Sequence, residues 1–314
     1  MNRKTDGIKG QESRIALTKV KWPGPGRVTP VDILILGLAG TLFTLTVWHI
    51  TIVLDYQWNW KVIPQYMLRF DQERGQWVPG IIMSGLITTL RLSLWTGIMA
   101  MVIGILMALA KTGKNPFLRR VAIIYVAIIR NIPVLVWILI SYYFIADSLF
   151  PGMEMDALGD MNDGPLKSLI LLITGPASDF PLFMAGAVSL AVYEGAYITE
   201  IVRAGIEGID KGQWEASSAL GFTYIQQMRH VILPQGFRTV VPALGGQLIS
   251  TIKDSAVLSV ISIPDLTFQG MELMAGTFLT FEIWITILTI YFIVCFSCSL
   301  LINHIENSYK KRHL

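Results

Sequence analysis

Polar and charged residues interrupt two long apolar stretches of this 314-residue chain. Glu194 and Tyr197 lie three residues apart in one stretch, a spacing that puts both on one face of a helix. Lys253 and Asp254 are adjacent in another, so on a helix their side chains would point about 100° apart. A carboxylate beside a tyrosine hydroxyl can hold a cationic group, so these residues point to binding of a polar solute.

Charged side chains are costly inside a membrane helix, by about 2.5–3.5 kcal/mol at its centre on insertion scales. They are retained where they face a cavity, a pathway or a charged partner. Arg130 also falls in the middle of an apolar stretch, and lining a pathway and pairing inside the bundle are both open for it, as for the residues above. Glu200 and Arg203, three residues apart near a helix end, are expected to form a structural ion pair or to contact the helix end.

Motifs for catalysis or metal binding are absent from the sequence. There is no H-E-x-x-H, no nucleophile elbow and no spaced Cys/His cluster. Cys295 and Cys298 form a C-x-x-C within an apolar run, where small apolar packing is the expected role. Thr112-Gly113-Lys114-Asn115 is only a fragment of a phosphate-binding loop. We therefore predict that the chain is not an enzyme and binds no metal or cofactor.

The composition is that of a membrane protein. Hydrophobic residues make up 53% of the chain and charged residues 15%, whereas soluble domains carry about 25% charged residues. A net charge of +3 gives no reason to expect nucleic acid as a partner. A helix needs about 20 mostly apolar residues to cross a bilayer. We predict an all-α polytopic membrane protein with six transmembrane helices, at residues 33–54, 81–110, 121–146, 182–206, 240–261 and 281–302.

The distribution of Lys and Arg predicts the orientation. Residues 1–32 carry seven of them and the loop after the second span four, whereas residues 147–181 carry one and residues 263–280 none. Under the positive-inside rule both termini are cytoplasmic, including the tail at residues 305–314. The segment at residues 55–80 is then an external connection, and its tryptophans suit a membrane interface. The acidic segment at residues 147–181 is a candidate partner surface.

The loop at residues 207–238, between the fourth and fifth predicted spans, has an unusual composition. Its Ser-, Ala- and Leu-rich stretches predict two short helices, at residues 211–220 and 224–231. Gly221 lies between them, where a left-handed turn suits a residue without Cβ. Pro234 is expected to end the second helix. Two short helices joined at a glycine make a compact knob outside the bilayer.

This loop resembles the EAA loop of ATP-binding-cassette (ABC) importer permeases, whose pattern is E-A-A, three residues, G, nine residues and I-x-L-P. Glu215-Ala216-Ser217, Gly221 and Val231-Ile232-Leu233-Pro234 occupy the four parts of the pattern. Ser217 and Val231 depart from it but keep size and character. The flanking residues resemble the polar amino acid branch of these permeases, at Tyr197–Ile206, Lys211–Ala216, Pro234-Gln235, Lys253-Asp254-Ser255 and Arg130–Leu135.

The resemblance covers about residues 80–302 and implies a type I importer permease core of five helices at residues 81–304. It does not extend to the first predicted span, at residues 33–54, which is therefore an extra N-terminal helix. It implies ATP hydrolysis by a separate subunit, with the loop docking on that ATPase. The residues implied for this coupling are Gly212, Glu215, Ala216, Gly221, Leu233 and Pro234. The candidate pathway residues are Glu194, which could take a substrate ammonium group, Tyr197, Lys253, Asp254 and Arg130.

The implied partners are a cytoplasmic ABC ATPase dimer, an extracytoplasmic solute-binding protein, a second permease subunit in a homo- or heterodimer, a polar amino acid and the lipid of a bacterial inner membrane. Two alternatives stay open. The cargo could be an opine, a compatible solute or a sulfur amino acid. The chain could instead be an ion-coupled transporter with Glu194, Glu200 or Asp254 as relay, but the inverted repeats common in such folds are not seen.

Overall fold

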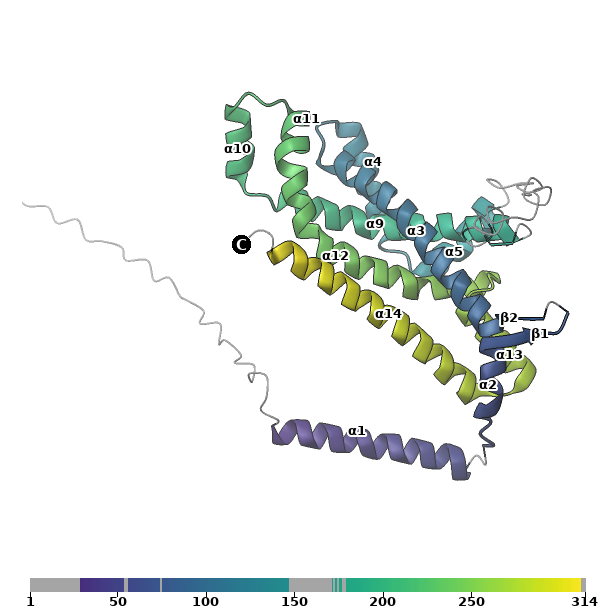
Figure 1. Ribbon diagram of the computed structural model, residues 1–314. Helices are drawn as coiled ribbons and strands as arrows, with labels where there is room; N and C mark the ends of the chain where they lie inside the picture. The colour runs from purple at the N-terminus through teal and green to yellow at the C-terminus, as the bar shows by residue number, and fades with distance from the viewer. Residues whose placement is uncertain are drawn as a thin grey trace, which may run out of the picture. The chain divides into compact units, whose positions relative to one another are not determined.

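A computed structural model describes residues 29–53, 56–73, 75–146, 171, 173, 175–176 and 179–311. The described residues are mostly helical, as predicted (Figure 1). They form two compact units, Met1–Gln57 and Trp58–Leu314. Most of the predicted acidic partner surface at residues 147–181 lies outside the described residues.

The first unit contains one long helix, α1 (Pro30–Trp48), which continues as a π-helical turn, η1 (His49–Val53). Thr29 caps its start, because the Thr29 hydroxyl accepts from the Asp32 N–H while the Asp32 carboxylate accepts from the Thr29 N–H. No residue of α1 is buried within the first unit. A capped, apolar helix of this length is suited to lipid.

The second unit begins with a short segment that sequence analysis left without structure. It contains the 3₁₀ turn η2 (Trp60–Val62), α2 (Ile63–Met67) and a hairpin of antiparallel strands, β1 (Leu68–Asp71) and β2 (Gln76–Pro79). The main helices follow: α3 (Ile81–Thr112), α4 (Pro116–Ile129), α5 (Val134–Ser141) with η3 (Tyr142–Ala146), α9 (Phe180–Glu207), α10 (Lys211–Ala219), α11 (Tyr224–Gln227) with η5 (Met228–Ile232), α12 (Leu233–Asp254) with η6 (Ser255–Ile261), α13 (Leu266–Thr277) and α14 (Thr280–Lys311).

Four helices among the described residues are long and apolar enough to cross a membrane: α1 with η1, α3, α9 and α14. A fifth span results if α4 and α5 are counted as one. The predicted count of six is not reached by this measure. Helix α12, which covers residues 240–254 of the predicted fifth span, is not among the four and carries Arg238, Lys253 and Asp254. The chain is a multi-pass helical membrane protein, and α12 is its most polar long helix in the bundle.

The third predicted span, at residues 121–146, is broken rather than continuous. Helices α4 and α5 meet at an angle of 110°. Pro133 lies at the break. The helix breaks there because a proline lacks the N–H that a continuous helix would need and because it disfavours helical geometry in the preceding residue. Arg130, predicted to be at mid-span, is therefore the C-terminal cap of α4.

Helix α9 is the buried centre of the second unit, packed against α3, α4, α5 and α12 (Figure 1). Where α3 packs against α9, a Cβ on Gly104 would lie 2.4 Å from the Ile198 side chain. Small residues allow this close packing of membrane helices. The Tyr125 hydroxyl of α4 donates to the Val192 carbonyl of α9 at 2.6 Å, and the Trp137 indole of α5 donates to the Ser189 carbonyl at 2.8 Å.

The predicted loop at residues 263–280 contains a helix, α13. Asp265 caps it, with Oδ1 accepting from the Phe268 N–H at 2.8 Å. The Asp265 side chain is fully buried, and its Oδ2 has no hydrogen-bond partner among the described residues. Asp265 lies outside the spanning helices, and burial raises its pKa from 3.8 to about 7.

This raised pKa predicts a pH-dependent stability. The folded chain keeps the Asp265 proton up to about pH 7, whereas the unfolded chain releases it near pH 4, so the free energy of unfolding falls as pH rises between these values, by up to about 1.4 kcal/mol per unit. Asp265→Asn keeps an acceptor for the Phe268 N–H but does not titrate. Thermal unfolding of the purified full chain should therefore depend less on pH in the variant, and equal slopes would contradict the assignment.

Candidate functional site

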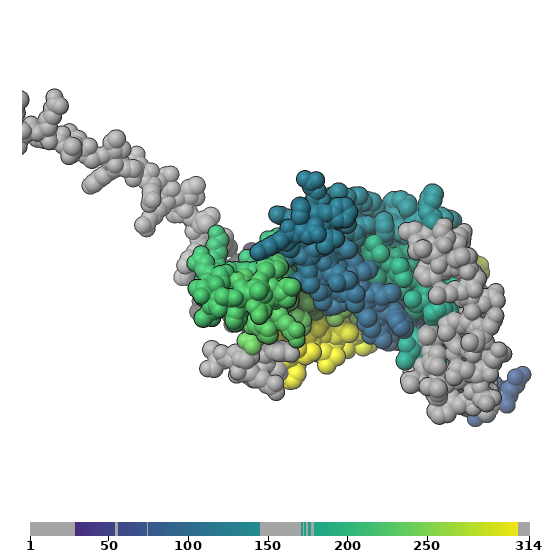
Figure 2. Space-filling view, turned by 90° about the horizontal axis from the view of Figure 1, so that it is seen from above, coloured from purple at the N-terminus to yellow at the C-terminus, as the bar shows by residue number. Residues whose placement is uncertain are grey.

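The loop after α9 folds into the predicted knob, made of α10 and α11 (Figure 1). In the space-filling view these residues, in green, form a lobe at one end of the helices (Figure 2). Gly221 joins the two helices with φ of +79°, so the predicted left-handed turn is confirmed. We call residues 207–232 the coupling knob.

Local side-chain hydrogen bonds fix the shape of the coupling knob. The Asp210 carboxylate accepts from the Gly212 N–H at 2.6 Å and starts α10. Thr223 and Gln226 form a capping box that starts α11. The Gln227 amide donates to the Ser218 hydroxyl at 2.8 Å and so ties α11 to α10. The knob is therefore a defined structure rather than a flexible link.

One prediction about this loop was wrong. Pro234 does not end the second helix, because α11 continues through the π-helical turn η5 into α12. Leu233 and Pro234 are the first two residues of α12, directly after the π-helical turn, in which the Leu233 N–H donates to the Met228 carbonyl. These two residues join the knob to the bundle and are not at its tip.

The surface of the coupling knob is partly apolar. Glu215 and Ala216 are exposed on α10, as their predicted contact with a partner requires. Near the glycine turn, Leu220 is 75% exposed and Ile225 76%, and Phe222 is also exposed. Sequence reasoning missed these three apolar residues, although large apolar side chains in an otherwise polar loop were the available signal. Such a patch indicates a protein contact.

Aromatic contacts attach the knob to α3. The Trp214 ring stacks on Tyr224 with ring centroids 6.3 Å apart, and the Lys114 ammonium lies 5.2 Å from the Tyr224 ring centroid. The Tyr224 hydroxyl donates to the Thr112 carbonyl at 3.3 Å. Knob residues from α10 and α11 thus meet the end of α3.

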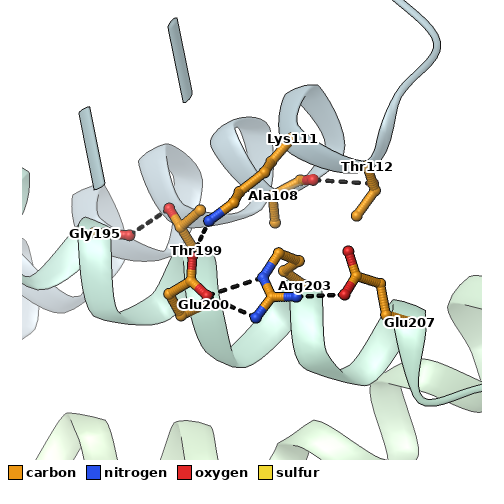
Figure 3. A network of polar contacts seen from close by, with 8 residues as sticks. All are labelled: Ala108, Lys111, Thr112, Gly195, Thr199, Glu200, Arg203 and Glu207. Carbon is orange, nitrogen blue, oxygen red and sulfur yellow. Dashed lines mark hydrogen bonds and ion pairs between the residues drawn. The ribbon is translucent and has the colours of Figure 1, made fainter. Parts of the chain in front are cut away.

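A charge network lies at the base of the knob, where α9 ends (Figure 3). Lys111 of α3 pairs with Glu200 of α9. Arg203 binds Glu200 at 2.8 Å and also pairs with Glu207. The expected pairing of Glu200 with Arg203 is confirmed, and Lys111 is an additional partner. The network links α3 to the last two turns of α9 just before the knob begins.

Glu194 lies at the centre of a buried polar cluster between α9 and α12. Its side chain is fully buried, and Oε2 accepts from the Gln247 amide at 2.5 Å. Oε1 is buried without a hydrogen-bond partner among the described residues. The Asp254 carboxyl and Thr251 are further polar neighbours of this carboxyl group. Two neighbouring carboxyl groups, one of which has an oxygen without a hydrogen-bond donor, can bind a cationic group.

The other candidate pathway residues divide into two groups. The Arg130 guanidinium lies 5.2 Å from the Tyr197 ring centroid, and the Tyr197 hydroxyl lies 3.2 Å from that of Tyr193. Lys253 is exposed whereas Asp254 is half-buried, as expected for adjacent helical residues. The structure therefore brings together Glu194 with Asp254 and Arg130 with Tyr197, and it turns Lys253 away from both pairs.

A groove of about 590 Å³ runs between α4, α9 and α12. Its polar lining includes Arg130, Glu200, Arg203 and Thr239. The groove therefore connects the charge network at the base of the knob with the Arg130 side chain. The second unit thus combines a polar groove, a buried acidic cluster and a partly apolar knob at one end.

Comparison with known proteins identifies the family. Residues 100–311 match the family model described as binding-protein-dependent transport system inner membrane component, and the chain belongs to this family. It is 30% identical over 212 residues to the probable glutamine ABC transporter permease protein GlnM of Bacillus subtilis (strain 168), covering 68% of this chain and 85% of GlnM. It is 31% identical over 229 residues to the glutamine transport system permease protein GlnP of Escherichia coli (strain K12), covering 72% and 93%.

Solved structures agree with this assignment. The crystal structure of an amino acid ABC transporter with histidines matches with a TM-score of 0.61 and 31% identity, over 81% of this chain and all of that chain. The MetNI methionine ABC transporter, at 21% identity and a TM-score of 0.54 over 73% of this chain and 95% of that chain, shares the fold. The chain is thus a permease subunit of an ABC transporter, a class of subunit that is not itself an enzyme.

The left-handed turn at Gly221 gives a prediction for the knob. Nothing lies within 4 Å of a Cβ built on Gly221, so Gly221→Ala should cost only backbone strain, about 1–2 kcal/mol. Gly246 of α12 has the same free space without a positive φ, so Gly246→Ala is the matched control. Thermal unfolding of the full chain should show a loss for Gly221→Ala and none for Gly246→Ala. Equal effects would contradict the role of the turn.

Proposed function

We propose that the Glu194 cluster binds the ammonium group of the transported amino acid. The observation that carries this proposal is the buried Oε1 of Glu194, which has no hydrogen-bond partner among the described residues and lies close to a second carboxyl group, that of Asp254. A buried ionised carboxylate is costly without a compensating positive charge. A substrate ammonium group supplies that charge without a residue of the bundle having to do so.

Arg130 is proposed to attract the substrate carboxylate. Its guanidinium lines the groove and stacks on Tyr197, one helical turn from Glu194. Arg203, the other arginine of the groove, is already paired with Glu200 and Glu207. An amino acid carries a positive ammonium group and a negative carboxylate. A route with a guanidinium at one point and carboxyl groups at another therefore favours the binding of such zwitterions over that of singly charged solutes. Glutamine and histidine, named with the relatives, are the first cargoes to test.

The coupling knob is proposed to dock on a cytoplasmic ATPase. Its exposed apolar residues beside Glu215 offer a contact surface, and its attachment to α3 and α9 would transmit movement to the helices around the substrate cluster. In this proposal the knob and both termini are cytoplasmic, two permease subunits form the route, and a binding protein delivers the amino acid outside. The bundle would alternate between an outward-facing and an inward-facing state. Different affinities of these partners for the two states make the transport cycle directional.

Glu194→Gln tests the substrate cluster. The variant keeps an acceptor for the Gln247 amide but loses the charge, so uptake at low substrate concentration should fall about tenfold or more, as for a lost charged hydrogen bond. Glu282→Gln is the control, because Glu282 is an equally buried carboxylate on α14 that accepts from the Asn59 N–H. Uptake is measured in proteoliposomes with the assembled importer. Unchanged uptake by Glu194→Gln would remove this residue from the route.

The same proteoliposomes separate the proposal from an ion-coupled transporter. Uptake is expected to require ATP and to persist when no ion gradient is present. Uptake that follows a proton or sodium gradient without ATP would contradict the proposed coupling.

Ile225→Asp tests the docking surface. A charge in the middle of the apolar patch should abolish co-purification of the ATPase while leaving the permease inserted, because Ile225 is exposed and its loss breaks no internal packing. His230→Asp adds a negative charge at another exposed position of the same knob and should retain the ATPase. Normal co-purification with Ile225→Asp would exclude this patch from the interface.

A further inference from the structure

The β1–β2 hairpin has one apolar face that is exposed among the residues that the structure describes. Its register pairs Leu68 with Pro79 and Phe70 with Trp77, and these four side chains share one face because side chains alternate along a strand. Phe70 is 51% exposed and Trp77 68% exposed, with their rings in an edge-to-face contact at 5.6 Å. The opposite face carries Arg69, Val78, Asp71 and Gln76.

The hairpin is held firmly at its base. The Gly80 N–H donates to the Met67 carbonyl at 2.8 Å and closes the hairpin onto α2. Before α2, Trp58 stacks on Trp60 and also contacts Phe281 of α14. The Asn59 N–H donates to Glu282 at 2.6 Å. The apolar face is thus presented by a structured segment attached to two long helices.

The position of the hairpin along α3 sets its depth in a bilayer. Strand β2 ends at Pro79 and α3 begins at Ile81. The 32 residues of α3 span about 48 Å, which exceeds the hydrocarbon core of about 30 Å and matches the full bilayer with its headgroups. The start of α3 therefore lies at headgroup depth, at the end opposite to the coupling knob (Figure 1).

The direction and chemistry of the hairpin fit the same depth. In Figure 1 it leaves the start of α3 sideways and does not continue along the helix axis. A two-stranded sheet cannot enter hydrocarbon, because its outer edges carry unpaired N–H and C=O groups. Tryptophan and phenylalanine beside a headgroup layer can bury their rings while the strand edges stay hydrated.

We propose that the β1–β2 hairpin is an interfacial anchor, whose face of Leu68, Phe70, Trp77 and Pro79 rests on the boundary between lipid headgroups and acyl chains. The occupant of this face is lipid, and the anchor holds the outer end of α3 at the membrane surface. The inference rests on the multi-pass membrane character of the chain and does not depend on the substrate cluster or the ATPase.

Spin labels on the two faces of the hairpin test the anchor. The full chain, with Cys295→Ala and Cys298→Ala, is reconstituted in nanodiscs of phosphatidylethanolamine and phosphatidylglycerol. Single labels at Phe70→Cys and Trp77→Cys are compared with labels on the opposite face at Arg69→Cys and Gln76→Cys. Collision with oxygen, which enriches in lipid, and with a water-soluble nickel chelate is measured by electron paramagnetic resonance.

Labels at positions 70 and 77 should show several-fold lower nickel accessibility and higher oxygen accessibility than labels at 69 and 76. Equal nickel accessibility at all four positions would overturn the proposal, because the apolar face would then be in water. Low accessibility to both reagents at 70 and 77 would also overturn it, since a protein surface would cover the face. A label at Leu68→Cys lies on the same apolar face and keeps both aromatic rings. It therefore repeats the accessibility comparison if the loss of Phe70 or Trp77 disturbs folding.

Discussion

A carboxylate buried at the centre of the bundle is the constraint on which the rest of this structure depends. Glu194 has no exposed surface, one hydrogen bond to Gln247 and a second carboxyl group, that of Asp254, nearby. A membrane protein that needed only stability would have an apolar residue there, because burying two carboxyl groups without a cation is unfavourable. In the proposed function the ammonium group of the substrate supplies this positive charge, and α9 and α12 provide the residues around it.

The helix that carries Glu194 also carries the mechanical link. Toward its end, α9 holds Glu200 and Arg203 in the charge network with Lys111 of α3, and the coupling knob follows directly. Helix α3 packs closely on α9 at Gly104. In the proposed function, a displacement of the knob would reach the Glu194 cluster through α9 and this closely packed neighbour.

Sequence patterns predicted the long helices well, because apolar length and turn chemistry are local properties. The spans that became α3, α9 and α14 and the left-handed turn at Gly221 followed from them. The hairpin and α13 were missed, since each is a short segment inside a predicted loop. The break between α4 and α5 was also missed, although its cause, Pro133, is local. The same limit applied to the site: Glu194 was identified by its charge in an apolar stretch, but its contact with Gln247 joins residues 53 positions apart.

The most direct test of the account is a structure of the assembled importer with an amino acid trapped in the membrane route. The account predicts that the ammonium nitrogen lies within hydrogen-bond distance of Glu194 Oε1, about 2.7–3.2 Å, with Asp254 beside it. A substrate bound elsewhere in the route, with Glu194 still contacting only Gln247 and its protein neighbours, would contradict the central claim.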